Sequence, residues 1–140
     1  MRLIHYLFLA AFLIGAATAA AAADIKVIAN SSVSASAVSA DELKGVFLET
    51  KTSLSAGSHV EPVLLKSGSV HETFLKEYVG RTDNALNTYY RSLVFTGKGA
   101  MPKAFASDVE VVSFVAKTKG AIGYVGAGAG TGSAKTIEVK

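Results

Sequence analysis

A stretch of 21 residues without a formal charge, residues 3–23, opens this 140-residue chain. It follows Met1 and Arg2, runs through an apolar segment, and ends in small residues, most of them alanine. A positive residue, an apolar segment and a small-residue cleavage site, in that order, are typical of a secretory signal peptide. We therefore predict that residues 1–23 are an export signal. The remaining residues 24–140 have a length that suits one domain.

Two cleavage positions fit the small-residue tract. Cleavage after Ala19 and after Ala23 are both compatible with it, and we favour Ala23 because a β-rich run begins directly after Asp24. The exported chain would then be periplasmic or secreted. One alternative stays open, because 21 uncharged residues are also long enough to span a bilayer as an uncleaved anchor.

The composition excludes several classes of protein. The chain has no Cys, which excludes Cys-based zinc sites, Cys nucleophiles and disulfides. It has 14 Lys and Arg against 11 Asp and Glu, and these charges form no basic stripe for nucleic acid. His59 and His71 lie in no metal-ligand pattern, and no Gly-x-Ser-x-Gly motif is present. We expect no cofactor, no metal and no enzymatic activity.

Short apolar runs alternate with helical patterns along residues 24–140. The runs predict strands at 25–29, 60–65, 121–125 and 136–139, and the helical patterns begin near Ser39, Ser69, Thr82 and Ser107. Strands separated by helices favour an α/β fold with a mostly parallel sheet flanked by helices. Because Pro62 lacks an N–H, it should lie at the first position of its strand or on a sheet edge.

The helix starts carry capping signals. Ser39 with Glu42, and Ser107 with Glu110, have the spacing of a capping box. Apolar residues three and four apart then predict the buried face of a helix. These faces carry Leu43, Val46 and Phe47 in the first helix and Val109, Val112 and Val115 in the last.

A glycine-rich tract, residues 126–134, follows the strand at 121–125. It is not a dinucleotide fingerprint, because only eight residues remain after Gly132 and none of them form a helix. It is not a P-loop either, because Ala134 rather than glycine precedes Lys135. We predict a flexible connector.

The strongest candidate for a ligand site joins the strand ending at Leu65 to the next helix. Lys66, Ser67, Gly68 and Ser69 would offer backbone N–H groups, hydroxyls and a positive charge to an anion at a helix N-terminus. A second interpretation stays open, in which Ser69 only caps the helix with Glu72 as its capping-box partner.

Two weaker candidates lie elsewhere in the sequence. Asn30 and Ser31 follow the first strand, at a strand end of the kind where α/β sheets bind ligands. Thr96 and Gly97 begin a Thr-Gly-Lys-Gly loop that would form a second backbone cradle. A polar loop and a turn between helices are the alternative interpretations of these two segments.

Three segments carry a resemblance to a known family. They are Leu-Lys-Gly-Val-Phe-Leu at 43–48, Phe-Thr-Gly-Lys-Gly at 95–99 followed by Pro102, and Gly-Ala-Ile-Gly-Tyr-Val at 120–125. In this order and spacing they resemble one lobe of the phosphate-type periplasmic substrate-binding proteins. They are most similar to the short, single-lobe members of the phosphate ABC transporter substrate-binding proteins. The resemblance covers about residues 24–126 and implies one lobe of a type 2 periplasmic-binding-protein fold.

The chain departs from that family at two places. Members usually have Phe-Leu-Gly-Lys with a Trp shortly after, whereas here residues 47–51 read Phe-Leu-Glu-Thr-Lys and Leu54 lies near the Trp position. Full-length binders carry an Arg-Ser-Asp-x-Ser-Gly-Thr anion loop, and residues 66–71 of this chain are shorter and lack the Asp.

The resemblance implies a non-catalytic periplasmic solute-binding protein, for phosphate or a similar oxyanion, linked to ABC-type phosphate transport. The alternative is a protein-interaction or sensor module that keeps the fold, has lost the solute site, and docks a membrane transporter or sensor. Two-lobed binders enclose their ligand, whereas one lobe leaves an anion in water, where charge interactions are weaker. Tight binding would therefore require a partner lobe or a homodimer, and no nucleic acid partner is expected.

Overall fold

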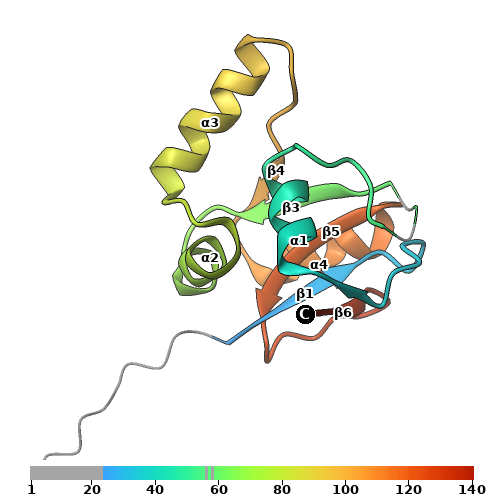
Figure 1. Ribbon diagram of the computed structural model, residues 1–140. Coiled ribbons are helices and arrows are strands. Elements are labelled where there is room, and N and C mark those ends of the chain that lie inside the picture. Colours follow the sequence, from blue (N-terminus) through green and yellow to red (C-terminus); the bar gives the residue numbers. More distant parts are fainter. Residues whose placement is uncertain (1–23, 56, 58) are drawn as a thin grey trace, which may run out of the picture.

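The computed structural model describes residues 24–55, 57 and 59–140 (Figure 1). The signal peptide that we predict for residues 1–23 lies outside the described residues. Across the part of the chain that is described, no helix is both long enough and apolar enough to cross a membrane.

Six strands form one mixed sheet in the order β2-β6-β1-β5-β3-β4. β3 runs parallel to both β4 and β5, and β2 runs parallel to β6, whereas β1 is antiparallel to β5 and to β6. The α/β prediction is confirmed, with β1 as the reversed strand. The strands are β1 (Ile25–Ala29), β2 (Ala37–Val38), β3 (Glu61–Leu65), β4 (Lys103–Phe105), β5 (Ala121–Gly126) and β6 (Lys135–Val139).

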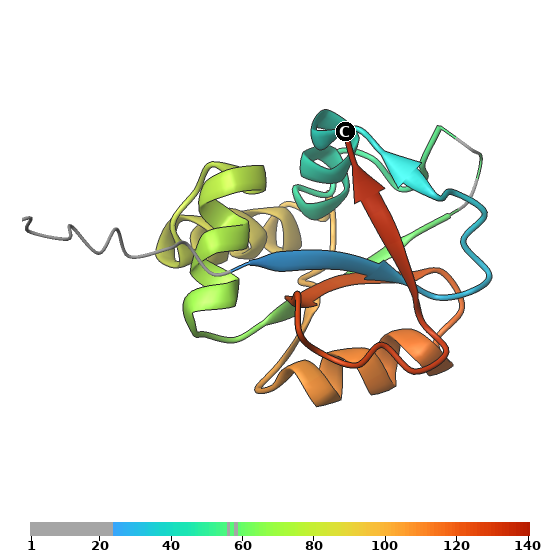
Figure 2. The same cartoon turned by 90° about the horizontal axis from the view of Figure 1, so that it is seen from below.

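Helices cover both faces of the sheet. α4 lies on one face and α1 and α2 lie on the other, as Figure 2 shows from below. α3 packs on the body through residues as far along as Leu93, and its last residues extend away from the sheet (Figure 1). The helices are α1 (Ala40–Phe47), α2 (Ser69–Phe74) with its π-helical continuation η1 (Leu75–Val79), α3 (Asp83–Phe95) and α4 (Asp108–Lys117).

α1 forms as its sequence predicts. Ser39 accepts a hydrogen bond from the backbone N–H of Glu42, and the Glu42 carboxylate accepts one from the N–H of Ser39, which completes the capping box. Hydrogen bonds from Ser55 and Ser39 lower the pKa of Glu42. The predicted apolar face is confirmed, because Leu43, Val46 and Phe47 are all fully buried.

α4 begins after Ser107 as predicted, but its buried face is different. Val111 and Val115 are fully buried, whereas Val109 is 78% exposed. The prediction for Val109 was wrong because α4 packs on the sheet through Val111 and Val115, whose side chains lie against Gly123 of β5. Residues 108, 111 and 115 share one helix face, and Asp108 on that face also accepts a hydrogen bond from the backbone N–H of Gly126.

Two strands, β2 and β4, were not predicted. They have two and three residues, too few for a periodic pattern, and they exist because they pair with β6 and β3. Pro62 is the second residue of an interior strand, so the prediction of a first or edge position was wrong. The position is tolerated because β4 pairs with β3 only from Val63 onward, so Pro62 has no partner on the β4 side, while β5 pairs with it on the other side.

The tract at 126–134 connects β5 to β6, which lie on either side of β1. The N–H of Ala127 donates to the carbonyl of Asp24, and the Lys26 ammonium donates to the carbonyl of Ala129. The connector is therefore attached to the first strand at two points. Its flexibility stays a prediction.

Two tyrosines of α3 complete the end of α1. The hydroxyl of Tyr89 donates to the carbonyl of Leu48, and the hydroxyl of Tyr90 donates to the carbonyl of Phe47, each at a distance of 2.5 Å. Carbonyl groups at a helix C-terminus have no partner within their own helix. Burial raises the pKa of the Tyr90 phenol, and the nearby Glu49 carboxylate raises it further, so this hydroxyl stays a donor.

The turn after α1 holds Glu49 in the left-handed region, at a φ of 59°. It is the only non-glycine residue with a positive φ among the described residues. This is the position at which the family that the sequence resembles usually has glycine. A side chain at such a φ costs about 1–2 kcal/mol, while glycine loses about 0.4–1 kcal/mol through its greater freedom in the unfolded chain.

We expect Glu49→Gly to stabilise the fold by about 1 kcal/mol, which corresponds to a rise in Tm of about 4 °C. Thermal unfolding followed by circular dichroism measures the change. Glu49→Gln is the matched control, because it removes the charge and keeps the strained backbone. An equal rise for the two variants would show that backbone strain is not the cause.

The same pair of variants makes a separate prediction about pH. Burial, and then the charge of Glu61, raise the pKa of Glu49, so ionisation of this carboxyl destabilises the folded state. The Tm advantage of Glu49→Gln over the wild type should therefore be absent below the unfolded pKa of about 4.3. It should grow as pH rises and level off above the raised pKa. A Tm difference that does not depend on pH contradicts this assignment.

Candidate anion-binding site

The candidate loop lies at the edge of the sheet where three parallel strands end. β3, β4 and β5 all have their carboxyl ends there, and the N–H of Lys66 donates to the carbonyl of Phe105 over 2.8 Å. Lys66, Ser67, Gly68 and Ser69 are all exposed. Ligands of α/β sheets bind in general at the carboxyl ends of such strands. The loop therefore lies where the fold favours a ligand.

Gly68, not Ser69, is the N-cap of α2. Its φ of 104° is one that glycine adopts without strain, and it has no side chain with which to cap the helix. The interpretation of Ser69 as a capping residue with Glu72 as its partner was wrong, because Ser69 is already the first helical residue. Within the described residues the hydroxyls of Ser67 and Ser69 have no hydrogen-bond partner.

The first turn of α2 presents donors to this loop. The N–H of Glu72 bonds to the carbonyl of Gly68 over 3.0 Å and closes the first turn. The N–H groups of the three preceding residues, Ser69, Val70 and His71, have no carbonyl within the helix to bond. Aligned peptide dipoles place a partial positive charge at the same end. The arrangement suits an oxyanion, with the Lys66 ammonium as the nearby full charge.

A second helix start lies beside the first. The Asp108 carboxylate, at the beginning of α4, accepts the N–H of Gly126 over 3.1 Å. A methyl group added at Gly126 would lie 3.6 Å from a methyl of Val70 in α2. Asp108 was not predicted as part of the site, although the Ser107 capping signal places a helix start directly before it. A carboxylate is thus present at the same sheet edge as the candidate loop, residues 66–69.

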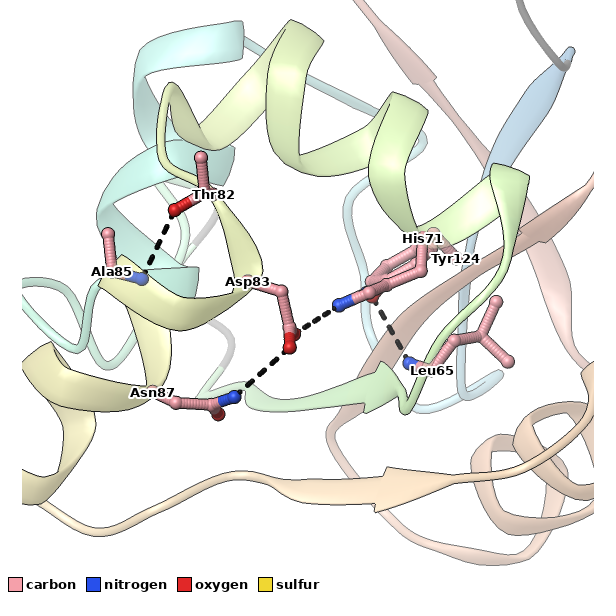
Figure 3. Close-up of polar contacts among 7 residues, drawn as sticks. All are labelled: Leu65, His71, Thr82, Asp83, Ala85, Asn87 and Tyr124. Atoms are coloured by element: carbon pink, nitrogen blue, oxygen red, sulfur yellow. Dashed lines mark hydrogen bonds and ion pairs between the residues drawn. The ribbon is translucent and has the colours of Figure 1, made fainter.

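A hydrogen-bond network that is buried at Tyr124 and His71 and exposed at Asp83 lies directly behind the loop (Figure 3). The hydroxyl of Tyr124, from β5, accepts the N–H of Leu65 over 3.1 Å and contacts Nδ1 of His71. Nε2 of His71 lies 2.7 Å from the Asp83 carboxylate at the start of α3. Asn87 donates to the other oxygen of Asp83 over 3.2 Å. His71 is only 2% exposed, so its ring is fixed on both sides.

The partners of His71 determine which of its nitrogens carries the proton. A carboxylate only accepts hydrogen bonds, so Nε2 must donate to Asp83. In the neutral ring Nδ1 then accepts, and the Tyr124 hydroxyl is its donor. Burial raises the pKa of the Tyr124 phenol, which keeps this donor protonated. Every polar atom of the pair is satisfied in this arrangement, and the role that it supports is structural.

The described residues contain no group of three or more His, Cys, Asp or Glu side chains that would hold a metal ion. Three of the surface cavities that these residues form have volumes of about 260, 390 and 350 Å³. None of these three is lined by Lys66, Ser67, Gly68 or Ser69. The candidate loop is an open surface.

The structure places Asn30 and Ser31 at the opposite edge of the sheet. β1 is antiparallel to β5, and the N–H of Asn30 bonds to the carbonyl of Ala121, where β5 begins. The buried Asn30 amide donates to the carbonyls of Val115 and Ala116, over 2.8 and 3.1 Å. Asn30 thus ties the end of α4 to β1, and neither residue is brought near the anion loop.

Thr96 and Gly97 lie at the far end of α3. The first residue of this 13-residue helix, Asp83, contacts His71 behind the anion loop. At 1.5 Å per residue the helix places its last turn about 20 Å away. The Thr96 hydroxyl bonds back to the carbonyl of Ser92 over 2.8 Å, and Gly97 has the positive φ of a helix-ending glycine. Thr96 and Gly97 therefore end α3.

Comparison with known proteins gives matches in structure alone. No protein-family model matches the chain, and no curated protein matches it in sequence. It is similar in structure to an ABC-type phosphate transport receptor from Vibrio cholerae, at 14% identity with a TM-score of 0.63, over 84% of this chain and 46% of the receptor. It is also similar to PstS from Borrelia burgdorferi, at 11% identity and a TM-score of 0.63, over 84% and 47%.

A third similar structure comes from Clostridium perfringens and is provisionally described as a phosphate ABC transporter substrate-binding protein with bound phosphate. The identity is 16%, the TM-score is 0.65, and the match covers 84% of this chain and 45% of that protein. The fold is that of one half of such receptors. The chain spans less than half the length of each, as the single-lobe resemblance implied.

The His71 network yields a prediction about stability. His71→Leu removes the acceptor of the Tyr124 hydroxyl and the donor to Asp83, and it leaves a buried polar group unpaired. We expect a loss of about 2–3 kcal/mol in the free energy of unfolding, measured by urea denaturation. His59→Leu is the control, because His59 is exposed and a substitution there should stay within about 0.5 kcal/mol. Equal losses for the two variants would contradict the network's role.

Proposed function

We propose that this chain is a non-catalytic solute-binding protein for phosphate or a similar oxyanion, linked to ABC-type phosphate transport. One observation carries the proposal: the loop before α2 has a glycine N-cap and two serine hydroxyls without partners in the described structure. If a serine of this loop capped the helix, its hydroxyl would bond a backbone N–H of the first turn, and that N–H would not be available to a ligand. Here the donors are free for a ligand.

The chemistry of the loop suits a small tetrahedral anion. First-turn N–H groups and a helix dipole bind phosphate and sulfate without further cationic groups. The Ser67 and Ser69 hydroxyls add two donors that can turn toward the anion, and Lys66 adds long-range attraction. Gly68 has no Cβ, and no atom lies within 4 Å of where one would stand, so an anion can approach the backbone there.

The structural comparisons support the same class of ligand. The similar solved proteins are described as phosphate receptors or phosphate-binding proteins, and one was solved with phosphate bound. The three structures compared above are 11–16% identical to this chain, so the similarity concerns the fold. The proposal of an oxyanion ligand therefore depends on the loop of this chain itself. The non-catalytic role follows by the same analogy.

A single lobe leaves this loop open to water. A charge pair in water is several-fold weaker than the same pair in an enclosed site. The chain matches less than half of the length of each receptor. We therefore propose that a partner lobe or a second copy closes over the loop when binding is tight. We further propose export of the protein to the periplasm with removal of residues 1–23. The intact mass of the purified protein tests that removal.

The first experiment is thermal unfolding of the purified protein with and without phosphate, at fixed ionic strength, beside sulfate and chloride. A ligand at about 100 times its Kd adds about 2.7 kcal/mol of stability, or about 10 °C in Tm for a domain of this size. We expect a rise of several degrees that is larger for phosphate or sulfate than for chloride. No selective rise would favour the alternative function, a protein-interaction or sensor module without a solute site.

Variants then locate the site. The double variant Ser67→Ala, Ser69→Ala should lose the oxyanion-dependent rise in Tm while keeping the Tm of the unliganded protein, because both side chains are exposed. The matched control is Ser92→Ala, Ser113→Ala, which removes two exposed helical hydroxyls elsewhere. A rise that survives in the first double variant would place the anion at another site.

A further inference from the structure

The described surface carries one cluster of exposed apolar side chains. Val94 is 52% exposed, Phe95 93% and Met101 46%, and all three lie within eight residues of one another at the far end of α3. The fourth large exposed apolar residue, Val109, lies on α4. Single exposed apolar residues are ordinary, but a cluster of them indicates a contact surface.

The same end of α3 carries only positive charge. From residue 84 to residue 107 the chain has three basic residues and no Asp or Glu. Lys103 lies over the Phe114 ring, 5.0 Å from its centre, whereas Arg91 and Lys98 are exposed and form no ion pair with a described residue. Glu49, at the base of this end beside Gly99, is half-buried. We call Arg91, Val94, Phe95, Lys98 and Met101 the α3 tip.

The tip is presented as a projection. Arg91, Val94 and Phe95 share one helix face, because they are three and four residues apart. The chain then reverses, as the N–H groups of Gly97 and Lys98 bond to the carbonyls of Val94 and Leu93, over 3.2 and 2.9 Å. Figure 1 shows this end of α3 farthest from the sheet. The shape is convex, with an aromatic ring at its end.

We propose that the α3 tip binds the surface of an anionic phospholipid bilayer. Apolar side chains flanked by Lys and Arg enter the boundary between headgroups and acyl chains, while the cations attract anionic headgroups. A bilayer accepts a small convex tip without a complementary pocket. A stable protein interface needs about 800 Å² from each partner, more than three side chains supply when even a large aromatic buries about 150–250 Å².

A tryptophan probe tests the proposal, because the chain has no Trp of its own. Phe95→Trp reports on the tip, and Val109→Trp, at the exposed position on α4, is the matched control. Both substitutions replace exposed side chains, so the fold is kept, as the Tm of each variant will show. The vesicles are phosphatidylcholine alone, or an equal mixture with phosphatidylglycerol. Residues 1–23, if retained, contribute equally to both variants.

We expect the emission of Phe95→Trp to shift to shorter wavelength with the anionic vesicles and much less with phosphatidylcholine alone. Val109→Trp should not shift. Each cation near an anionic surface changes partitioning about five-fold, so adding Arg91→Gln and Lys98→Gln to Phe95→Trp should weaken binding about 30-fold.

Four outcomes would overturn the proposal. They are no shift with either vesicle, the same shift for Val109→Trp, equal binding to neutral vesicles, and a shift that follows protein concentration without vesicles. The last would assign the tip to contact with a second copy of the chain. Phosphate binding by the loop is measured separately, so either proposal can fail alone.

Discussion

The buried hydroxyl of Tyr124 joins the elements that build the candidate site. Its ring extends from β5 and stacks on Phe74 of α2, with centroids 3.8 Å apart and planes within 7°. Its oxygen accepts the last N–H of β3, from Leu65, and meets His71 in the first turn of α2. His71 continues the connection to Asp83, where α3 begins. The Tyr124 hydroxyl thus connects the end of β3, the start of α2 and, through His71, the start of α3. The candidate loop lies between β3 and α2.

Strong local signals were predictable from the sequence, and long-range partners were not. The helix starts at Ser39 and Ser107 follow from side chains three residues apart, and β1 follows from its apolar run, so each was confirmed. Val109 was assigned to the core because its spacing from residues 112 and 115 fits a helix face. The face that is buried is the one that packs Val111 and Val115 against Gly123 of β5. No periodicity within α4 contains that information.

The candidate site shows the same division. The loop from Lys66 to Ser69 was recognisable as a strand-to-helix connection because small polar residues lie between an apolar run and a helical pattern. Whether its serines were free was not, because Ser69 and Glu72 have capping-box spacing and only the position of the N-cap, Gly68, separates the two interpretations. His71 and Asp83 are twelve residues apart on different helices, so their pairing depends on the π-helical turn at Leu75–Val79 and the reversal at Gly80. Gly80 has the sequence signal of a helix-ending glycine, whereas the π-helical turn has no reliable signal.

The candidate loop and the α3 tip are linked through the base of α3. Asp83 fixes the start of the helix to His71, and the hydroxyls of Tyr89 and Tyr90 fix its middle to the end of α1. A swing of α3 about the loop would break these hydrogen bonds, and the loss of one that leaves a buried group unsatisfied costs about 1–3 kcal/mol. A surface that holds the tip consequently also sets the direction in which the loop faces, about 20 Å away along the helix. Under the proposed function, in which a partner lobe or a second copy closes over the loop, a fixed orientation toward that partner would raise the effective concentration of the two halves.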